Sequence, residues 1–426
     1  MFHLRKASMV FVFITVLLDM IAFGIIVPVF NPLVLSFTNQ DYTGASLLNG
    51  VFSMIFAMVQ LFSSPILGTL ADRFGRRPII LLSNLGTALD YLILALAPSL
   101  AWLFFGRVLS GATTASVTVA SAYVADVTPE DKRAGAYGMI SACFGVGFVV
   151  GPAIGGLLAA HGLRLPFWVA AAMSLVNFAY GIFVLPESLA PEHRNAFSWS
   201  RANPFGAIKM LRRHAELSGL AVMNLIGYVA NQALPQLWVF YALFMWSWTM
   251  STIGISLAVV GIVTILVSAV VTQPVVNRLG ERRAIVLGLV LGAAGFVLYG
   301  TGNQVLFWVA IPVNMLWMIA GSASQALMTR RVGKQEQGEL QGAINLLRSV
   351  GMIVGPPLFA GVFALSVSRA HSWRAPGAGW FLAAALLVLS AIIALRVTGA
   401  DDDVKEQVDT TGTLEGALVG DLPVAE

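Results

Sequence analysis

The stretch Gly68-Thr-Leu-Ala-Asp72-Arg73-Phe-Gly75-Arg76-Arg77-Pro78 places a charged segment between two long apolar ones. This pattern predicts a tight turn between two membrane helices, because Gly75 accepts backbone angles that other residues avoid and Pro78 suits the first turn of a helix. Asp72 lies among three arginines, so we expect an ion cluster. The net positive charge of the loop favours the cytoplasmic face of a membrane.

A similar segment recurs about 205 residues further along the chain. It reads Thr272-Gln273-Pro274-Val-Val-Asn277-Arg278-Leu-Gly280-Glu281-Arg282-Arg283, with Gly280 aligned on Gly75. The pair Gly151-Pro152 also recurs, as Gly355-Pro356, at nearly the same separation. Two matches at one separation predict that the chain consists of two parallel repeats.

The composition excludes a soluble globular protein. Of the 426 residues, 58% are hydrophobic and 11% are charged, whereas a soluble domain contains about 25% charged residues. Apolar runs of about 20 residues can cross a bilayer as helices. The first run lacks a small-residue cleavage site, so we interpret it as a span and not as a signal peptide. We predict twelve spans, near residues 8–35, 45–70, 78–98, 101–126, 134–160, 164–186, 215–245, 251–276, 284–302, 304–328, 338–365 and 376–397.

The basic residues predict the orientation of these spans. With both termini in the cytoplasm, 20 of the 25 Lys and Arg residues fall on the cytoplasmic side. Three fall outside, at Arg164, Arg369 and Arg374, and two lie within spans, at Arg107 and Arg348. This distribution follows the positive-inside rule. The net charge of +4 therefore reflects topology and does not indicate binding to nucleic acid.

The longest internal linker separates the sixth predicted span from the seventh. We therefore expect an N-terminal six-helix half at residues 1–190, a cytoplasmic linker at 191–214 and a C-terminal six-helix half at 215–397. Residues 398–426 are rich in Asp and Glu and have little apolar periodicity, which predicts a disordered acidic tail. The predicted fold class is an all-α membrane protein with twelve transmembrane helices in two halves.

Four ionisable residues lie inside predicted spans: Asp19, Asp90, Arg107 and Arg348. Such groups are costly in hydrocarbon, so each is a candidate for function. A carboxyl group removed from water holds a proton more readily than an exposed one, which makes Asp19 and Asp90 candidate proton carriers. The alternative for both is a structural hydrogen bond, and for Arg107 it is a fixed ion pair. Arg348 could reach the membrane surface, pair with an Asp or sense an anion.

Span five carries a row of small residues with a proline: Gly147, Gly151, Pro152, Gly155 and Gly156. We expect them to lie on one helical face, because small residues let a second helix approach closely. Pro152 is expected to bend or loosen the span.

The charged loop is also a candidate gate. Asp126, at the inner end of span four, is expected to share the arginines of the loop with Asp72. Such a cluster can close the cytoplasmic side in one state and open it in another, and Asp72 can cap the amino end of span eleven near Gly338. The alternative is a static clamp that fixes the loop. The expected gate consists of Gly68, Asp72, Arg73, Gly75, Arg76, Arg77 and Asp126.

The run from Gly68 to Arg77 resembles the signature loop of the major facilitator superfamily of secondary transporters. The surroundings of Arg107 resemble the span-four motif of that family, whose arginine is tied to proton coupling, and the glycines of span five resemble its antiporter motif. Much of the chain is also similar to the bacterial tetracycline efflux pumps. The segments that carry this likeness are Leu18-Asp19, Met58-Val-Gln60, Leu89-Asp90-Tyr91, Gly106-Arg107, Ala122-Tyr123-Val-Ala-Asp126, Ser141-Ala-Cys143-Phe144-Gly145, Thr252-Ile-Gly-Ile-Ser-Leu-Ala258, Leu279-Gly-Glu-Arg-Arg283 and Gln337-Gly-Glu-Leu-Gln341-Gly342.

The resemblance implies roles for matching positions. Asp19, Asp90 and Arg107 would act in proton coupling, within the major facilitator fold. A second set would supply polar groups to the substrate cavity; neutral amides there suit a bulky, partly apolar ligand. The cavity candidates are Gln60, Gln232 and Gln325 from the resemblance, together with Asn231, Asn314 and Arg348 from the sequence.

Three positions depart from the pumps. Gly292 stands where they carry a carboxylate in span nine, and Thr264 stands where they carry a histidine in span eight. An arginine that follows their span seven is missing near Met245. Spans nine and ten contain no Asp or Glu, so we expect the proton carrier in the first half.

We therefore expect a proton-coupled exporter of amphiphilic drugs or related small molecules that works by alternating access. Its partners would be the substrate, protons and membrane lipids, with no cofactor, no metal and no nucleic acid. The resemblance implies a monomer in the bacterial inner membrane with both termini in the cytoplasm. The alternative is an importer or exporter of an endogenous metabolite, anionic or not, or of a siderophore, with Arg348 in the cavity.

An enzyme is not expected. The five histidines lie at ends or in loops, and no metal-ligand spacing or pair of nucleophile and base stands out. The chain has no GxxxxGK[ST] loop, so ATP-driven pumping is disfavoured. A receptor that transports nothing stays open as an interpretation.

Overall fold

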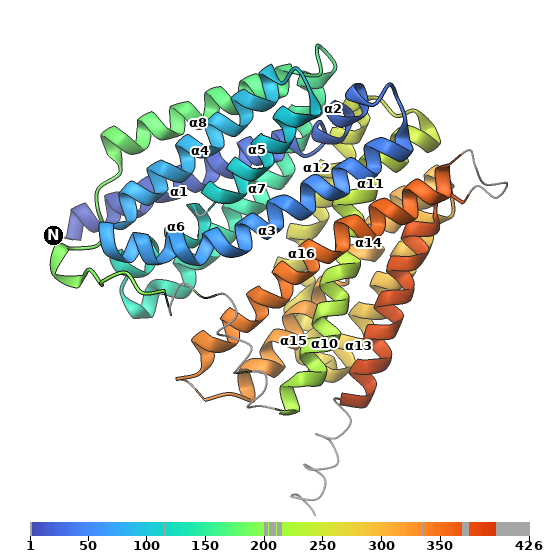
Figure 1. Ribbon diagram of the computed structural model, residues 1–426. Coiled ribbons are helices and arrows are strands. Elements are labelled where there is room, and N and C mark those ends of the chain that lie inside the picture. Colours follow the sequence, from blue (N-terminus) through green and yellow to red (C-terminus); the bar gives the residue numbers. More distant parts are fainter. Residues whose placement is uncertain are drawn as a thin grey trace, which may run out of the picture.

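The computed structural model describes residues 2–114, 116–199, 203, 210, 215–333, 335–368 and 375–397, and within these residues it contains helices and loops but no strand (Figure 1). The blue-to-green helices come first in the chain. They are α1 (Phe2–Ile26), α2 (Phe30–Phe37), α3 (Tyr42–Phe74), α4 (Arg76–Leu96), α5 (Leu100–Thr113), α6 (Ser116–Val127), α7 (Arg133–Ala159) and α8 (Leu165–Val184).

The second series of helices runs from green to red in Figure 1. It consists of α10 (Ala215–Asn231), α11 (Ala233–Trp246), α12 (Met250–Leu266), α13 (Thr272–Gly300), α14 (Gln304–Met315), α15 (Met318–Arg330), α16 (Gln337–Val367) and a last helix at Ala378–Val397.

Short polar side chains start several of these helices. The Asp41 carboxylate accepts hydrogen bonds from two backbone N–H groups in the first turn of α3, at 3.0 Å each. Asn303 does the same for α14, at 2.8 and 3.1 Å, and the Thr249 hydroxyl accepts from Thr252 N–H at the start of α12. These caps satisfy N–H groups that have no partner within the helix.

Eleven helical stretches in the described part of the chain are long and apolar enough to cross a membrane. Most coincide with one predicted span each. The stretch Met250–Gly300 is 51 residues long and contains two predicted spans, 251–276 and 284–302. It is interrupted by a π-helical turn at Val267–Val271 and by non-helical backbone at Gly280. The all-helical membrane architecture is thus confirmed, whereas the count of twelve crossings stays a prediction.

The two aligned loop glycines share an unusual conformation. Gly75 has a φ of 108° and Gly280 a φ of 75°. Residues other than glycine rarely adopt such backbone angles. The prediction that Gly75 supplies backbone freedom to a tight turn is confirmed, and its aligned partner shows the same requirement.

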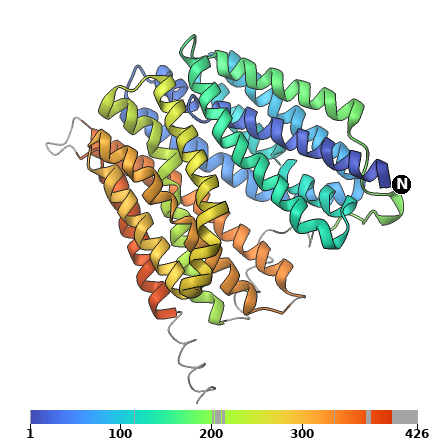
Figure 2. The same cartoon turned by 180° about the vertical axis from the view of Figure 1, so that it is seen from behind.

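The blue-to-green helices lie on one side of the molecule and the yellow-to-red helices on the other (Figure 1). The two groups converge near the labels α2 and α11 and diverge toward the labels α6 and α15. Between them, α3 contacts α16 and α7 contacts α12; Figure 2 shows the second contact from behind. We call the end that carries residues 72–77 and 281–283 the charged end.

The contacts of α3 with α16 and of α7 with α12 depend on glycine. A Cβ atom added to Gly50 in α3 would lie 2.5 Å from Ala360 Cβ in α16. One added to Gly254 in α12 would lie 2.9 Å from the Gly156 Cα in α7 and would also collide with the carbonyl of Pro152. Gly254 lies 204 positions after Gly50, the same separation as between Gly151 and Gly355. Two glycines at this separation therefore both lie at close approaches between the two groups of helices.

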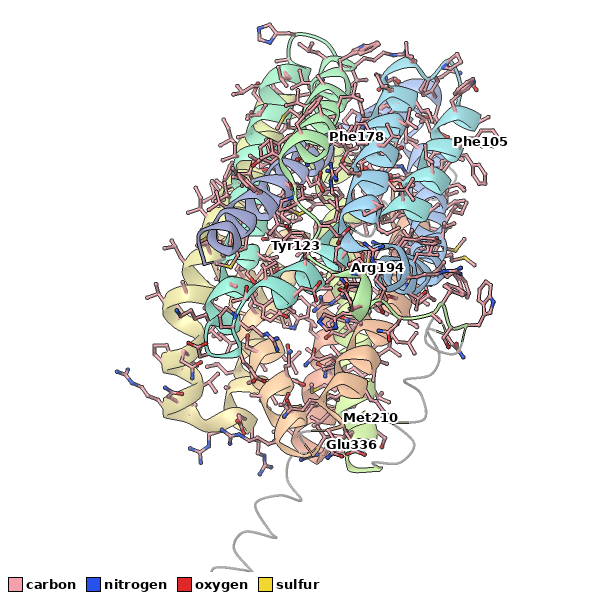
Figure 3. The ribbon with its side chains drawn as sticks, turned by 90° about the vertical axis from the view of Figure 1, so that its left-hand side faces the viewer. Phe105, Tyr123, Phe178, Arg194, Met210 and Glu336 are labelled. Atoms are coloured by element: carbon pink, nitrogen blue, oxygen red, sulfur yellow. The ribbon has the colours of Figure 1, made fainter. Side chains whose placement is uncertain are left out.

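The outer surface of the bundle is apolar. Phe105 is 63% exposed and projects from the bundle in Figure 3, and Phe183 is 86% exposed. By contrast, Trp238 and Trp380 are almost completely buried and pack edge to face. A large exposed apolar surface around a packed core is what contact with lipid requires.

Most of the predicted linker, 191–214, and the whole predicted tail, 398–426, lie outside the described residues. The described beginning of the linker includes a short 3₁₀ helix at Pro191–His193. The division of the chain into two halves stays a prediction.

Two glycines of α3 provide a matched test of the contact between α3 and α16. Gly50→Ala is expected to lower the free energy of unfolding by about 1–3 kcal/mol, because the new methyl group overpacks the interface. Gly68→Ala faces open space, with no atom within 4 Å of the added Cβ, and is expected to be neutral or mildly stabilising. Thermal unfolding in detergent measures both, and equal effects of the two substitutions would contradict this account.

Candidate functional site

Asp90 and Arg107 form a buried ion pair between α4 and α5. The Arg107 guanidinium donates to Asp90 Oδ2 at 2.7 Å, and the Asp90 side chain is completely buried. Gly106 makes room for this carboxylate, since a Cβ added there would lie 2.7 Å from Asp90 Oδ1. The aromatic ring of Phe30 lies 4.6 Å from the Arg107 guanidinium carbon. The pair is therefore held between a glycine and an aromatic ring.

The Asp90–Arg107 pair leaves polar capacity unused. Asp90 Oδ1 and Arg107 Nε are both buried, and neither has a hydrogen-bond partner within the described residues. A carboxylate can accept several hydrogen bonds, and when protonated it can also donate one. The Ser110 side chain of α5 also interacts with the Asp90 carboxylate, so a change in the protonation state of Asp90 would affect its contacts with both Arg107 and Ser110.

Asp19 in α1 lies in a separate buried site. Its side chain accepts a hydrogen bond from Asn177 Nδ2 at 2.8 Å. With the Asn84 amide oriented so that its nitrogen faces the carboxylate, Asn84 donates to the second oxygen at 3.1 Å. Asp19 therefore bridges α1 to α4 and α8 through two amides that the sequence analysis did not identify. Both residues could have been identified from the sequence, because each is a polar residue within an apolar span.

Arg76 is the centre of the charged cluster. It pairs with Asp72 one turn away and with Asp126 at 3.1 Å between Nε and Oδ2. The Ser188 hydroxyl also donates to Asp126, at 3.0 Å. Two carboxylates thus share one arginine, as expected, although three arginines were expected to take part.

The other two arginines of the loop have different contacts. Arg73 is exposed and lies 5.1 Å from the centre of the Phe74 ring. Arg77 donates to the carbonyl of Ile182 near the end of α8. Arg282, in the second series of helices, makes a similar contact with a backbone carbonyl: it donates to Leu395 near the end of the last helix. Arg77 and Arg282 thus tie their loops to the ends of other helices.

Glu187 is a loop residue whose role the sequence analysis missed. Its carboxylate accepts from the backbone N–H groups of Arg76 at 2.8 Å and Arg77 at 3.3 Å, which begin α4. It also accepts from the N–H groups of Ser188 and Leu189. A carboxylate at a helix N-terminus is favoured by the helix dipole. A Cβ on Gly75 would displace this carboxylate from its position over the turn, and the positive φ of Gly75 already favours glycine here.

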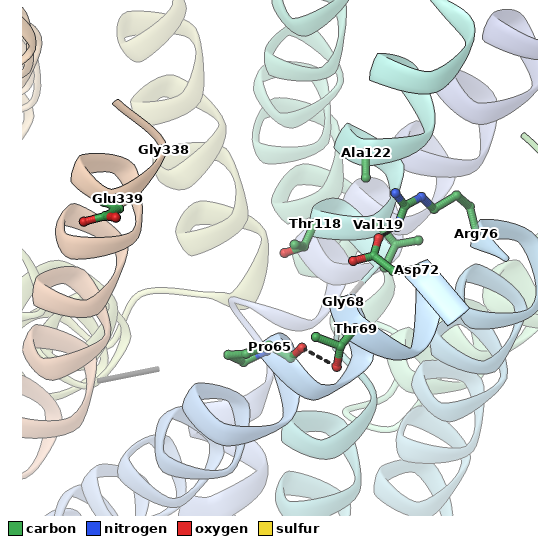
Figure 4. Close-up of a pocket in the computed structure, with 10 residues that line it drawn as sticks. All are labelled: Pro65, Gly68, Thr69, Asp72, Arg76, Thr118, Val119, Ala122, Gly338 and Glu339. Atoms are coloured by element: carbon green, nitrogen blue, oxygen red, sulfur yellow. Dashed lines mark hydrogen bonds and ion pairs between the residues drawn. The ribbon is translucent and has the colours of Figure 1, made fainter. Parts of the chain in front are cut away.

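A cavity of about 700 Å³ opens at the charged end between the two groups of helices. Asp72 and Thr118 lie on one wall, and Gly338 and Glu339 of α16 lie on the other (Figure 4). Gly68 also lines the cavity, with open space at its Cβ position. The predicted cap of α16 by Asp72 is not made in this conformation, because the open cavity separates them and Arg76 holds Asp72 on its own wall.

The glycines of α7 lie on two faces, which corrects the prediction that they share one. Gly147, Gly151 and Gly155 contact α1 at Met20, Gly24 and Ile25. Gly156 and the Pro152 carbonyl instead contact Gly254 of α12. The physical reason is the spacing: residues four apart repeat on one face of a helix, whereas Gly156 directly follows Gly155 and points about 100° away. α7 is therefore packed closely on both sides.

The predicted cavity residues occupy different environments. Gln60 of α3 is half-buried, and Asn231 and Gln232 are half-buried at the break between α10 and α11. Gln232 packs against Gly355 of α16, where an added Cβ would lie 2.5 Å from its own Cβ. The break thus brings the Gln232 side chain beside Gly355 of α16.

Asn314 and Gln325 contrast with each other. Asn314 is completely buried and donates to the carbonyl of Gly292 at 2.9 Å, which ties α14 to α13. Gln325 is exposed, and its amide donates to Gln341 of α16 at 3.4 Å. Arg348 of α16 is also exposed, with its guanidinium carbon 5.5 Å from the centre of the Tyr228 ring. Of these side chains, Asn314 sits between helices while the other two are accessible.

Within the described residues no group of three His, Cys, Asp or Glu side chains is arranged to hold a metal ion.

The cap formed by Glu187 can be tested by substitution. Glu187→Ala removes an acceptor shared by four N–H groups and is expected to lower the free energy of unfolding by about 1 kcal/mol. Glu192→Ala removes the same charge from an exposed residue of the 3₁₀ helix and is expected to have no effect. Thermal unfolding in detergent compares the two, and a loss of the same size in both variants would refute the capping role.

The buried pair predicts a non-additive double substitution. Asp90→Asn or Arg107→Gln alone leaves its partner buried without a counter-charge, which is expected to cost about 3–5 kcal/mol. Combining the two substitutions removes both charges, so the stability loss is expected to be smaller than the sum of the single losses. Thermal unfolding of the four proteins measures the coupling. Additive losses would show that the pair contributes no interaction energy.

Comparison with known proteins agrees with this architecture. The sequence matches the Major Facilitator Superfamily over residues 12–356 and 248–419. It is 37% identical to the class C tetracycline resistance protein of Escherichia coli, over 88% of this chain and 93% of that protein. It is 34% identical to the class E protein of the same species, over 89% and 92%. The crystal structure of the nucleoside transporter NupG superimposes with a TM-score of 0.74 at 14% identity, over 92% of this chain and 98% of that one. The chain therefore belongs to the Major Facilitator Superfamily of membrane transporters.

Proposed function

We propose that this protein exports amphiphilic drugs or related small molecules in exchange for protons. The observation that carries the proposal is the Asp90–Arg107 ion pair, completely buried at Asp90 and located within helices that are apolar enough to span a membrane. Relatives named for tetracycline resistance, at 37% and 34% identity, support the export of a drug-like molecule. A carboxylate in such a place is a candidate proton carrier by the cost of its burial alone.

The proposed coupling follows from the contacts of Asp90. Protonation would neutralise the carboxylate and weaken its bond to Arg107, whose charge cannot be removed. The released guanidinium would then be free to move relative to the Phe30 ring and α4. Asp19, held by two amides, is the second proposed coupling residue. Its contacts with α4 and α8 would link a change of charge to a shift of three helices.

The proposed transport cycle is alternating access. The cavity at the charged end is open, while the α3–α16 and α7–α12 contacts close the opposite end. Rocking about those contacts would close the charged end. The cluster around Arg76 would act as the gate. The contacts of α3 with α16 and of α7 with α12 would act as pivots, and Gly147, Gly151 and Gly155 would hold α7 against α1 within the first group.

The proposed topology has twelve crossings in two six-helix halves, 1–190 and 215–397, joined by a cytoplasmic linker at 191–214. Three observations support it: the aligned positive φ values of Gly75 and Gly280, the equivalent contacts of Gly50 and Gly254, and the break in Met250–Gly300. The charged end would face the cytoplasm of a bacterium, with both termini and the acidic tail on that side. We propose a monomer in the inner membrane.

Transport in inside-out vesicles tests the proposal. Vesicles with an acidic interior and a pH dye are expected to lose luminal protons when tetracycline or a related amphiphile is added. Asp90→Asn is expected to abolish this release, since the variant has no ionisable group at the site. Asp19→Asn is expected to reduce it strongly. Asp131→Asn, at an exposed position of the 3₁₀ helix Glu130–Lys132, serves as the matched control and should behave as wild type.

The opposite result has a defined meaning. If no compound of a broad panel moves protons in wild-type vesicles while uptake into right-side-out cells rises, the protein is an importer and the proposed direction is wrong.

A further inference from the structure

Arg348 carries a positive charge that its own part of the chain does not neutralise. Between residues 215 and 397 the only acidic residues are Glu216, Glu281, Glu336 and Glu339. All of them lie at helix starts or at the break of α13. The one nearest in α16, Glu339, is nine residues away, which is about 13 Å along the helix. No ion pair of Arg348 occurs among the residues that the structure describes.

The side chain of Arg348 is nevertheless positioned. Its guanidinium lies over the ring of Tyr228 in α10, with 5.5 Å between the guanidinium carbon and the ring centre. A guanidinium can stack on an aromatic face and still present several N–H donors in a plane, an arrangement that matches a carboxylate. The contact with α10 holds the charge beside the helix bundle, whereas a charge turned toward hydrocarbon would be costly.

The helical register of α16 places Arg348 beside the surface that faces the other group of helices. Gly338 lines the cavity at the start of α16, and Pro356 and Ala360 contact Gly50 of α3 further along. Gly338 and Pro356 are 18 residues apart, which is five helical turns, and Ala360 follows about one turn later, so the three positions lie on one face. Asn345 and Ser349 fall on the same face, and Arg348 lies next to it on the side of α10.

Gln60 lies at the same depth on the facing wall. Helix α3 runs from its contact with Ala360 toward the cavity, and α16 runs in the opposite direction. Gln60 is ten residues past Gly50, about 15 Å from the contact. Arg348 is eight residues before Pro356 and twelve before Ala360, about 12–18 Å from the same contact. An amide and a guanidinium thus stand at one level on opposite helices.

The carboxylates of the other wall are already engaged. Asp90 pairs with Arg107 at 2.7 Å, and Asp19 accepts from Asn177 at 2.8 Å. Of the charged residues in the predicted spans, Arg348 is therefore the one that forms no ion pair or hydrogen bond with another charged or amide side chain among the described residues. We propose that Arg348, stacked on Tyr228, binds a negatively charged group of the transported molecule, a carboxylate or an ionised aromatic hydroxyl. This inference rests on the proposed function for its cavity and narrows the substrate class to amphiphilic anions and zwitterions.

Two xanthene dyes of similar shape and opposite charge test this site. Fluorescein is an anion at neutral pH and rhodamine 123 is a cation. Fluorescence anisotropy with the purified full chain in detergent measures their binding in the absence of any proton gradient. Wild type is expected to bind fluorescein about tenfold or more tightly than rhodamine 123. Arg348→Gln is expected to lose this preference, and Arg348→Lys, which keeps the charge but not the planar stacking group, is expected to be intermediate.

A matched variant controls for the loss of one positive charge. Arg278→Gln removes an arginine at an exposed position of α13 and should keep the preference for fluorescein. Equal affinities for the two dyes in wild type, no binding of fluorescein, or an unchanged fluorescein affinity in Arg348→Gln each overturns the inference.

The same proteins separate this inference from the proposed function. Charge-selective binding that Arg348→Gln abolishes, without proton movement in vesicles, would support the anion site and refute proton coupling. Proton movement that Asp90→Asn abolishes, without charge-selective binding, would do the reverse.

Discussion

The hydrogen-bonded contact of 2.7 Å between Arg107 and the completely buried Asp90 imposes a constraint on the whole first group of helices. A charge removed from water is tolerated only beside a counter-charge or a set of donors. The surrounding sequence meets this demand: Gly106 allows the carboxylate to approach α5, and the Phe30 ring covers the guanidinium. The break between α1 and α2 brings Phe30 to this position. Asp19 meets the same demand differently, with amides from two helices in place of a cation.

The glycine contacts determine how these charged sites move relative to the opposite wall. At Gly50 and Gly254 the neighbouring helix leaves no room for a Cβ, and for Gly254 the nearest atoms are backbone atoms that cannot rotate away. Small residues let two helix backbones approach closely. We therefore interpret the contacts at Gly50 and Gly254 as the pivots of the proposed movement. They lie away from the charged end, and at that end the walls separate around the cavity. A small rotation of the two groups of helices about these contacts can therefore open or close the cavity at the charged end.

Local sequence predicted the features that depend on neighbouring residues. The helical spans follow from runs of apolar residues, and the positive φ of Gly75 follows from a glycine at a tight turn between two helices. Gly280, which the sequence aligns with Gly75, has the same kind of conformation. The ion cluster was predicted only in outline. The charges of Asp72 and Asp126 and their expected location at the same end of their helices indicate shared arginines, although Asp126 lies 50 positions from Arg76.

Contacts between distant residues could not be predicted in this way. Glu187 caps a helix that begins 111 positions earlier, and nothing in the sequence around Glu187 distinguishes it from another loop glutamate. The choice of Arg76 over Arg73 and Arg77 depends on the direction in which each side chain leaves a turn. The two faces of α7 could have been found from the spacing of its glycines, but their partners in α1 and α12 depend on tertiary packing. Asn314 shows the same limit, because an amide in a span can face a cavity or, as here, a neighbouring backbone carbonyl.

The two walls of the cavity differ in a way that bears on coupling. In the proposed cycle, Asp19 and Asp90 can gain protons, so the charge of their wall varies. Arg348 cannot lose its proton in a protein, so the charge of the facing wall is constant. A negatively charged substrate group held at Arg348 would therefore experience more repulsion from the facing wall when its carboxylates are ionised and less when they are protonated. This field alone would favour binding of the anion together with protons. Exchange for protons therefore has to come from the helix movements that protonation of Asp19 and Asp90 is proposed to cause.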